Sequence, residues 1–460
     1  MENHIEIAKE DIRAIEYAFR PFVGAPKPPQ RDRYGHGGTL KTELSNTVSS
    51  IESNRQEVGI DAENLLVLQL MSAEAVLDVD ILQNKLHLAL VEEVKNADGT
   101  MRYVVQFASK DDIAVFEHER ALWESDNPNG SNVLTYAQRR DLFACIESIR
   151  PLSPEDRTGK RLSEAINGDT LPDGLFIVDI DVWFDGDLAR RNNIERQIKM
   201  ALGTGDSTLL GDLFVLPNLL LGRAKVNRFT LEVLRKLDLI AQVDFPIGVI
   251  ATEQCELYSA DFVPAVNNML DENAPLACVI DSGIFSGNSL LSKIIVAEED
   301  FDLTEETTSD FNGHGTGVAG IVAYGDLTDY DKENRVFNPL VRLCNGKVMH
   351  NDSTWNTPVF DESKRPEELV ASAIRYFHEN NNCRVFNLSA GFESRIYNGG
   401  RQMAWASLLD ALSRELDVVI IVSAGNVPSP DVPVFTGRED LMENTRNQLL
   451  SEEHRLIDPA

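Results

Sequence analysis

The N-terminal residues 1–60 are expected to form a helical arm. Apolar residues recur every three or four positions at its start, which predicts an amphipathic helix. These residues are Ile5, Ala8, Ile12, Ile15 and Phe19. The Pro- and Gly-rich segment 21–38 then predicts a connector, and a polar helix is expected at about 40–58. We interpret His36, in the connector sequence YGHGG, as a loop residue because no apolar helix follows it.

Residues 61–153 are expected to form a small α/β domain. Segments rich in β-branched and other apolar residues predict strands at 65–70, 86–94 and 102–108. A hairpin turn at Asp98-Gly99 is expected to join the last two strands. Helical periodicity returns at 110–124 and 136–149.

Residues 174–246, after a polar linker at 154–173, are expected to form a second small domain. Apolar and polar residues alternate over 176–184, which predicts a strand. The elements that follow are a helix at 187–202, a strand at 213–226, a helix at 229–236 and a strand at 239–244. This order is typical of a ferredoxin-like half-sandwich.

The polar face of the strand at 176–184 carries Asp179 and Asp181. We interpret it as a face that is exposed to solvent. The alternative is a calcium site formed by Asp179, Asp181 and Asp185. The EF-hand loop, however, requires small polar residues and a Gly at set positions, where this chain has bulky apolar residues.

From Leu276 onward, apolar strands end in Gly-rich turns and alternate with helices. The expected strands are LACVI, VRLCNGKVM, CRVFNLS and DVVIIVSA, and the expected helices lie at 314–324, 366–380 and 401–415. This alternation predicts a doubly wound, mostly parallel sheet. In such a sheet, functional sites gather at the carboxyl ends of the strands.

The composition excludes several classes of protein. A formal charge of −31, from 43 Lys and Arg against 74 Asp and Glu, opposes binding to nucleic acids and anionic membranes, and no basic run offsets it. The charged N-terminus is unlike a signal peptide, and no run of about 18 apolar residues is present to span a bilayer. The five cysteines are widely spaced, which is typical of reduced thiols in a cytoplasmic protein.

Two side chains in the last region have the chemistry of a catalytic pair. Asp281 follows an apolar strand in ACVIDSG, where a carboxylate can hold an imidazole in one tautomer, although many such Asp residues merely start a turn. His314 opens a predicted helix in NGHGTGVAG. The helix dipole disfavours a cation there, which suits a neutral general base, and the alternative is a His that only caps the helix.

Two further motifs also follow buried strands. In VVIIVSAGN, the amide of Asn426 can donate a hydrogen bond to an oxyanion, an effect worth about 3 kcal/mol, or it simply ends the strand. In FNLSAG, the open backbone of residues 387–391 can pair with an extended peptide, or it belongs to an ordinary buried strand.

Together these motifs resemble those of the subtilase family of serine peptidases over residues 276–460. ACVIDSG is similar to the family's Asp motif, HGTGVAG to its His motif, FNLSAG to its substrate-binding strand and SAGN to its oxyanion motif. The resemblance implies that Asp281 orients the imidazole, that His314 is general base and acid, and that Asn426 stabilises the oxyanion. It implies a peptide-hydrolysing enzyme whose substrate cleft is lined by Ser389, Ala390 and Gly391. Structural calcium is common in the family, but the sequence has no evident ligand cluster, so no cofactor is expected.

The family's nucleophile, the Ser of a G-T-S-x-A-x-P turn, is not found among residues 427–460. Ser429 lies in a Pro-rich loop and Ser451 in a polar helix, so neither stands in that context. The final RLIDPA is similar to the approach to the family's next core strand. We therefore expect the nucleophile beyond residue 460, in a longer protein.

The regions before the peptidase motifs suggest regulation. Residues 214–246 are similar to the end of a subtilase propeptide, which implies that Asp244-Phe245-Pro246 and the connector up to Asn273 lie near the cleft. An ordinary α/β module packed on the protease is the alternative. The long N-terminal extension resembles that of the protease half of two-gene ATPase–subtilase systems linked to phage defence, which implies an AAA-type ATPase as partner.

The sequence is consistent with two functions. The first is a latent intracellular serine endopeptidase, and the second is a non-catalytic pseudoprotease that binds peptides or acts as a scaffold in an ATPase-containing complex. The joint presence of Asp281, His314 and Asn426 favours the enzyme, since a scaffold has no chemical need of all three. A nucleotide-binding protein is excluded, because neither G-x-G-x-x-G nor G-x-x-x-x-G-K-[ST] follows a strand.

Overall fold

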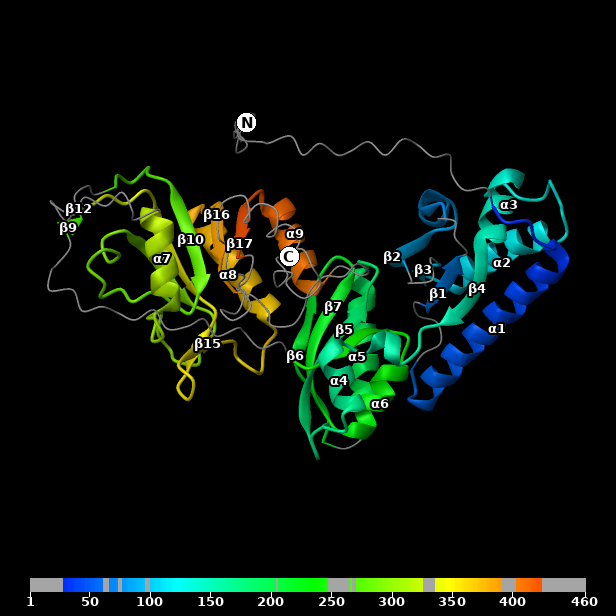
Figure 1. Cartoon of the computed structure of the whole chain (residues 1–460), viewed down its shortest axis with the longest axis horizontal. Helices are drawn as coiled ribbons and strands as arrows, with labels where there is room; N and C mark the ends of the chain where they lie inside the picture. The colour runs from blue at the N-terminus through cyan, green and yellow to red at the C-terminus, as the bar shows by residue number, and fades with distance from the viewer. Residues whose placement is uncertain are drawn as a thin grey trace, which may run out of the picture.

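The computed structural model describes residues 28–60, 66–72, 77–95, 100–203, 206–246, 265–266, 270–325, 336–390 and 403–423. These form three α/β units that lie in a row, with one unit between the other two (Figure 1). We call them the N-terminal unit (33–151), the central unit (155–244) and the C-terminal unit (the described residues from 265 to 423). No helix within the described ranges is long and apolar enough to cross a membrane. The helix expected at 5–19 falls outside these ranges.

The N-terminal unit is an antiparallel sheet covered by helices. In spatial order its strands are β2 (Leu88–Lys95), β3 (Met101–Phe107), β1 (Leu66–Ser72) and β4 (Ile146–Pro151). The helices are α1 (Arg33–Glu57), α2 (Lys110–Glu124) and α3 (Tyr136–Cys145), and a π-helical turn (Ile81–Lys85) precedes β2. All three helices share one apolar core with β1, in which Leu44, Phe116 and Phe143 accompany Leu68.

His36 lies in α1, so its prediction as a loop residue is wrong. The helix starts directly after Asp32, whose side chain caps it by accepting a hydrogen bond from Gly35 N at 3.2 Å. Nε2 of His36 lies 2.9 Å from the carbonyl oxygen of Ile146, and its ring packs edge-on against Trp123. These tertiary contacts override the low helix propensity of the neighbouring glycines.

The central unit has the ferredoxin-like topology that the sequence predicts. Its antiparallel sheet has the spatial order β6 (Thr208–Val215), β7 (Leu219–Val226), β5 (Phe176–Trp183) and β8 (Ile240–Asp244). Its helices are α4 (Lys160–Asn167), α5 (Leu188–Leu202) and α6 (Arg228–Lys236). Val178, Ile180 and Val182 of β5 form a buried core with these helices.

Three element boundaries differ from the prediction. The strand expected at 213–226 is a hairpin, in which Leu216 N donates to the carbonyl oxygen of Leu219 at 2.8 Å. The linker expected at 154–173 contains α4, whose buried Leu162 gives too weak a periodicity to be recognised in a polar segment. The helix expected at 136–149 ends at Cys145, because the residues that follow pair with β1.

The C-terminal unit has a parallel five-stranded sheet. In spatial order its strands are β11 (Ile295–Asp300), β13 (Arg342–Lys347), β10 (Leu276–Asp281), β16 (Val385–Leu388) and β17 (Val419–Val422). Two short pairs accompany it: β9 (Ala265–Val266) with β12 (Val336–Phe337), and β14 (His350–Asp352) with β15 (Thr357–Val359).

Helices cover both faces of this sheet, which confirms the doubly wound prediction (Figure 1). On one face, α7 (His314–Tyr324) packs Ala319 and Ala323 against Val279. On the other face, α8 (Pro366–Asn381) and α9 (Ala404–Leu416) share a core with Cys278 and Ile280. Successive residues of β10 thus serve opposite faces, as expected for a strand that is buried on both sides.

A buried ion cluster joins the central unit to the C-terminal unit. Arg365, immediately before α8, lies 3.2 Å from Asp181 and 3.6 Å from Asp179, which are both on β5. In the other direction, Arg223 of β7 pairs with Asp179 at 2.7 Å and donates to three carbonyl oxygens between residues 361 and 364. Each unit therefore supplies an arginine to the other.

The prediction of a solvated face at Asp179 and Asp181 is consequently wrong. Each residue is only 6% exposed. Strand alternation determines that both carboxylates point to one side of the sheet, and the packing of the C-terminal unit on that side buries them.

The N-terminal and central units are joined in a similar way. Arg55 of α1 forms two parallel hydrogen bonds with Asp238, from Nε to Oδ1 at 2.7 Å and from Nη2 to Oδ2 at 2.6 Å. Both side chains are buried. Paired bonds between a guanidinium and a carboxylate are strong and directional, so this contact fixes the orientation of the two units.

Candidate active site

The structure brings Asp281 and His314 together. Asp281 is the last residue of β10 and His314 is the first of α7, 33 positions further along the chain, and Nδ1 of the imidazole lies 2.7 Å from Oδ1 of the carboxylate. The Asp281 side chain is 1% exposed, whereas that of His314 is 19% exposed. Because a carboxylate only accepts hydrogen bonds, Nδ1 donates and Nε2 keeps the lone pair that can accept a proton.

Two glycines allow α7 to approach the turn after β10 this closely. A Cβ atom at Gly315 would collide with the carbonyl oxygen of Gly283 and lie 3.2 Å from the Cβ of Asp281. Gly283 itself has φ of +101°, and a Cβ there would lie 2.5 Å from the carbonyl oxygen of Thr308. The second residue of HGTG and the last of DSG must therefore lack a side chain for the pair to form.

The surroundings of His314 favour its protonated form. Burial lowers the pKa of the imidazole, but the hydrogen bond and charge of Asp281, together with the charge of Asp310, outweigh burial and raise the pKa above its ordinary value. The helix dipole led us to expect a disfavoured cation at this position. The hydrogen bond and charge of Asp281 and the charge of Asp310 act against the dipole, so the expectation of a disfavoured cation is not met.

The other predicted site residues are placed only in part. Strand β16 pairs with β10, so Ser389 follows β16 at the same edge of the sheet as Asp281. The Ser389 hydroxyl lies 3.0 Å from Oδ1 of Asn387, and Ala390 is buried in the core. Gly391 and Asn426 lie outside the described residues, and the roles expected of these four residues stay predictions.

Sequence analysis missed Lys347, which lies beside Asp281 in the pairing of β10 and β13. The side chain is fully buried, and Nζ donates to Oε2 of Glu305 at 2.6 Å and to the carbonyl oxygens of Thr307 at 2.8 Å and Ser309 at 3.1 Å. Lys347 thereby holds the segment 305–309, which precedes His314, against the sheet. A lysine within the apolar run VRLCNGKVM is the signal that could have revealed it.

A cavity of about 600 Å³ lies between the central and C-terminal units. Its lining includes Pro246, which follows β8, together with Arg223, Thr304 and His350. Thr304 and His350 follow the carboxyl ends of β11 and β13, the edge of the sheet at which Asp281 also lies. Pro246, at the end of the described part of the central unit, therefore lines a space at this edge.

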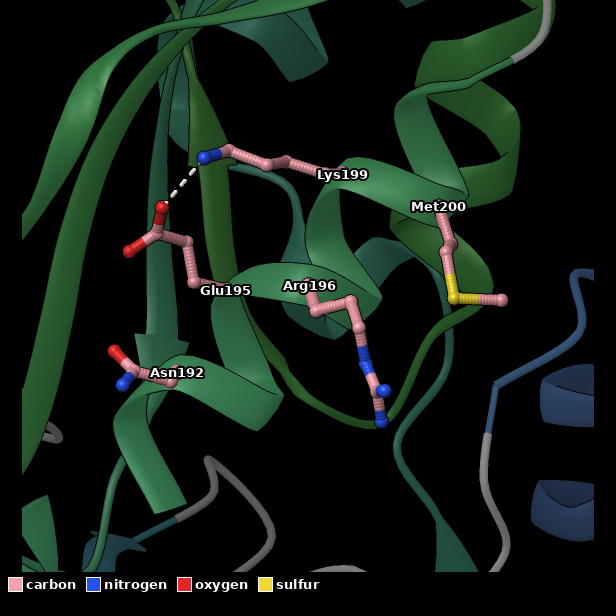
Figure 2. Close-up of a pocket in the computed structure, with 5 residues that line it drawn as sticks. All are labelled: Asn192, Glu195, Arg196, Lys199 and Met200. Atoms are coloured by element: carbon pink, nitrogen blue, oxygen red, sulfur yellow. Dashed lines mark hydrogen bonds and ion pairs between the residues drawn. The ribbon is translucent and has the colours of Figure 1, made fainter. Parts of the chain in front are cut away.

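Another cavity, of about 460 Å³, lies on α5 and is lined by Asn192, Glu195, Arg196, Lys199 and Met200 (Figure 2). Lys199 and Glu195 form an ion pair of 2.6 Å beside it. These residues project from a single helix of the central unit, and none of them belongs to the Asp281–His314 pair in the C-terminal unit. We assign no chemistry to this cavity.

The described residues contain no group of three or more His, Cys, Asp or Glu side chains arranged to bind a metal ion. The four cysteines within these ranges are buried free thiols, at positions 145, 278, 344 and 383.

Comparisons with known proteins match all three units. Residues 272–443 match the model of the subtilase family, residues 156–245 that of the Y4kK central domain, and residues 34–153 that of the Y4kK N-terminal domain. Uncharacterized protein y4kK of Sinorhizobium fredii (strain NBRC 101917 / NGR234) is 27% identical over 274 residues, which cover 58% of this chain and 82% of that protein. Uncharacterized protein y4bN of the same strain is 40% identical over 92 residues, which are 20% of each chain.

Proposed function

We propose, from the subtilase domain that residues 272–443 of this chain carry, that the protein is a serine endopeptidase of the subtilisin type. The observation that carries the proposal is the 2.7 Å contact between Asp281 and His314 at the carboxyl edge of a doubly wound sheet. A buried carboxylate on Nδ1 and a partly exposed imidazole are what nucleophilic catalysis by a hydroxyl requires.

In this proposal, Nε2 of His314 takes the proton of a serine hydroxyl as the serine oxygen attacks the peptide carbonyl. Asp281 keeps the imidazole in the required tautomer and stabilises the imidazolium that forms. The His then donates the proton to the leaving amine, and water hydrolyses the acyl-enzyme in a second round. We place the serine beyond residue 460. Asn426 and a backbone N–H would stabilise the oxyanion by donating hydrogen bonds to it.

We further propose that the peptidase is latent. The central unit is held on the C-terminal unit by the Arg365 and Arg223 cluster, and Pro246 lines the cavity at the edge of the sheet at which Asp281 lies. A unit docked in this way would keep substrate away from His314 until it is displaced. We also propose that an AAA-type ATPase partner displaces the central unit. The proposed role is antiviral defence, and the proposed location is the cytoplasm. The buried free thiols support a reducing compartment.

The alternative is a pseudoprotease whose cleft binds peptides without cleaving them. One experiment separates the two functions: the intact mass of the natural gene product is measured before and after treatment with a fluorophosphonate probe. A serine peptidase should exceed the mass of these 460 residues and gain one adduct. A protein with neither property would be a pseudoprotease, and a larger protein that gains an adduct only after the central unit is displaced would be latent.

The histidine dependence of the adduct tests the catalytic pair. His314→Ala should remove the adduct without unfolding the chain. His350→Ala is the matched control, because His350 also pairs with a buried carboxylate, Asp302, at 3.0 Å. An adduct that persists in His314→Ala would refute the proposed role of this histidine.

A further inference from the structure

The side chain of Asp310 is buried under the first turn of α7. Its Oδ1 accepts hydrogen bonds from the backbone N–H groups of Asn312 and Gly313, each at 3.1 Å. Its Oδ2 accepts from the N–H of Thr316 at 2.9 Å and from the hydroxyl of Thr316 at 2.7 Å. The N-cap residue of α7 is Gly313, which has no side chain to cap the helix, so Asp310 supplies the cap from three positions upstream.

Asp310 is also connected to the turn that carries Asp281, by two routes. The hydroxyl of Ser282 lies 3.2 Å from Oδ1 of Asp310 and 3.2 Å from Oδ1 of Asp281. The hydroxyl of Thr316, which donates to Asp310, accepts from the N–H of Phe285 at 2.9 Å. The carboxylate thus bonds both to the helix that begins with the histidine and to residues of the turn that follows its aspartate partner.

We propose that Asp310 is a positioning residue for the Asp281–His314 pair, holding the first turn of α7 against the 281–285 turn and placing a second negative charge beside the imidazole. Its role in catalysis rests on the proposed function, but its effect on the imidazole does not. Among the described residues, the charged groups that act on His314 are Asp281 from β10 and Asp310 from the segment before α7.

Asp310→Asn is the appropriate substitution, because it preserves the shape of the side chain. It removes the charge and turns one acceptor oxygen into an NH2 group that faces N–H donors. We expect the cap to loosen and the protonated imidazole to lose support, so the pKa of His314 should fall. The Nδ1 proton of His314 should also exchange faster, because the imidazole is held less firmly on Asp281.

The experiment is an NMR titration of the whole chain, with His314→Gln used to assign one of the eight histidine signals. In Asp310→Asn, the titration midpoint of His314 should shift to lower pH and the low-field Nδ1 proton signal should weaken. Asp302→Asn is the matched control, because Asp302 is a buried carboxylate of the same segment that pairs with His350 instead. It should leave both signals of His314 unchanged.

An unchanged His314 titration in a folded Asp310→Asn protein would overturn the inference, and so would an equal shift in Asp302→Asn. If Asp310→Asn does not fold, Thr316→Val takes its place, since it removes only the hydroxyl bridge between Asp310 and Phe285. A weakened Nδ1 signal in that variant supports the inference, and an unchanged signal overturns it. None of these results depends on peptide hydrolysis, so failure here and failure of the fluorophosphonate experiment are distinguishable.

Discussion

Arg365 and Asp181 form a buried ion pair of 3.2 Å across the boundary of two units, although they lie 184 positions apart in the chain. The same guanidinium also bonds Glu367, from Nε to Oε2 at 3.0 Å. The charges of Asp179, Glu367 and Asp181 outweigh the effect of burial on this group and raise the pKa of Arg365, so it stays charged. The docking of the central unit therefore depends on a cation that cannot be neutralised.

Replacing this cation should weaken the docking severely. Arg365→Met removes the cation that pairs with buried Asp181, and breaking a buried pair in this way costs about 3–5 kcal/mol. Hydrogen exchange of the β5 amides should accelerate, and labelling by the fluorophosphonate probe should become faster if docking causes latency. Arg375→Met is the control, because Arg375 lies on α8 in an exposed pair with Glu415 and should cost at most about 1 kcal/mol. Equal effects of the two substitutions would contradict the assignment.

The contact between the N-terminal and central units should also be specific. Arg55→Leu removes both hydrogen bonds to buried Asp238, and we expect a loss of about 3–5 kcal/mol in the free energy of unfolding. A double-mutant cycle with Asp238→Asn, followed by chemical denaturation, measures the coupling. The same cycle on Lys110 and Glu52, an exposed pair that also involves α1, should give a coupling of about 0.2–1 kcal/mol. A weak coupling at Arg55 would show that the units do not depend on this pair.

Glycines of α7 should respond in opposite directions to substitution by alanine. Gly315→Ala places a Cβ against the carbonyl oxygen of Gly283, so it should push α7 away from Asp281 and remove the fluorophosphonate adduct. Gly317 and Gly320 have open space where a Cβ would lie, and alanine there should stabilise the helix by up to about 1 kcal/mol. Thermal unfolding of the three variants checks both signs. A Gly315→Ala protein as stable as Gly317→Ala would contradict the steric role of Gly315.

His314 should contribute a stability that depends on pH. Since its pKa is raised in the folded chain, the contribution is fully present below the unfolded value of about 6.5 and is lost as the pH rises through the folded value. The difference in unfolding free energy between the wild type and His314→Gln should therefore shrink on going from acidic to alkaline pH. Chemical denaturation at a series of pH values measures it. In an Asp281→Asn background the trend should flatten, and a difference that grows with pH would be inconsistent with the raised pKa.

The sequence by itself determined the parallel sheet of the C-terminal unit, the ferredoxin-like order of the central unit and the positions of Asp281 and His314 at a strand end and a helix start. The apolar runs at 276–280, 385–388 and 419–422 predicted parallel strands, and a parallel sheet places the carboxyl ends of its strands at one edge. HGTGVAG marked both a helix start and a histidine, and Gly315 of this motif and Gly283 of DSG proved to be steric requirements of the contact between Asp281 and His314. Local pattern was sufficient here because Asp281 ends its own strand and His314 begins its own helix.

The tertiary structure alone decided which polar residues are buried. Asp179 and Asp181 have the sequence pattern of a solvated strand face, and His36 that of a loop, because a sequence does not show which surface will be covered by a distant unit. The partners that bury these residues come from elsewhere in the chain: Arg365 and Arg223 for the aspartates, Trp123 and Ile146 for His36. Burial of a charge is stable only with such partners, so its location follows from the packing of the units and not from the local pattern of residues.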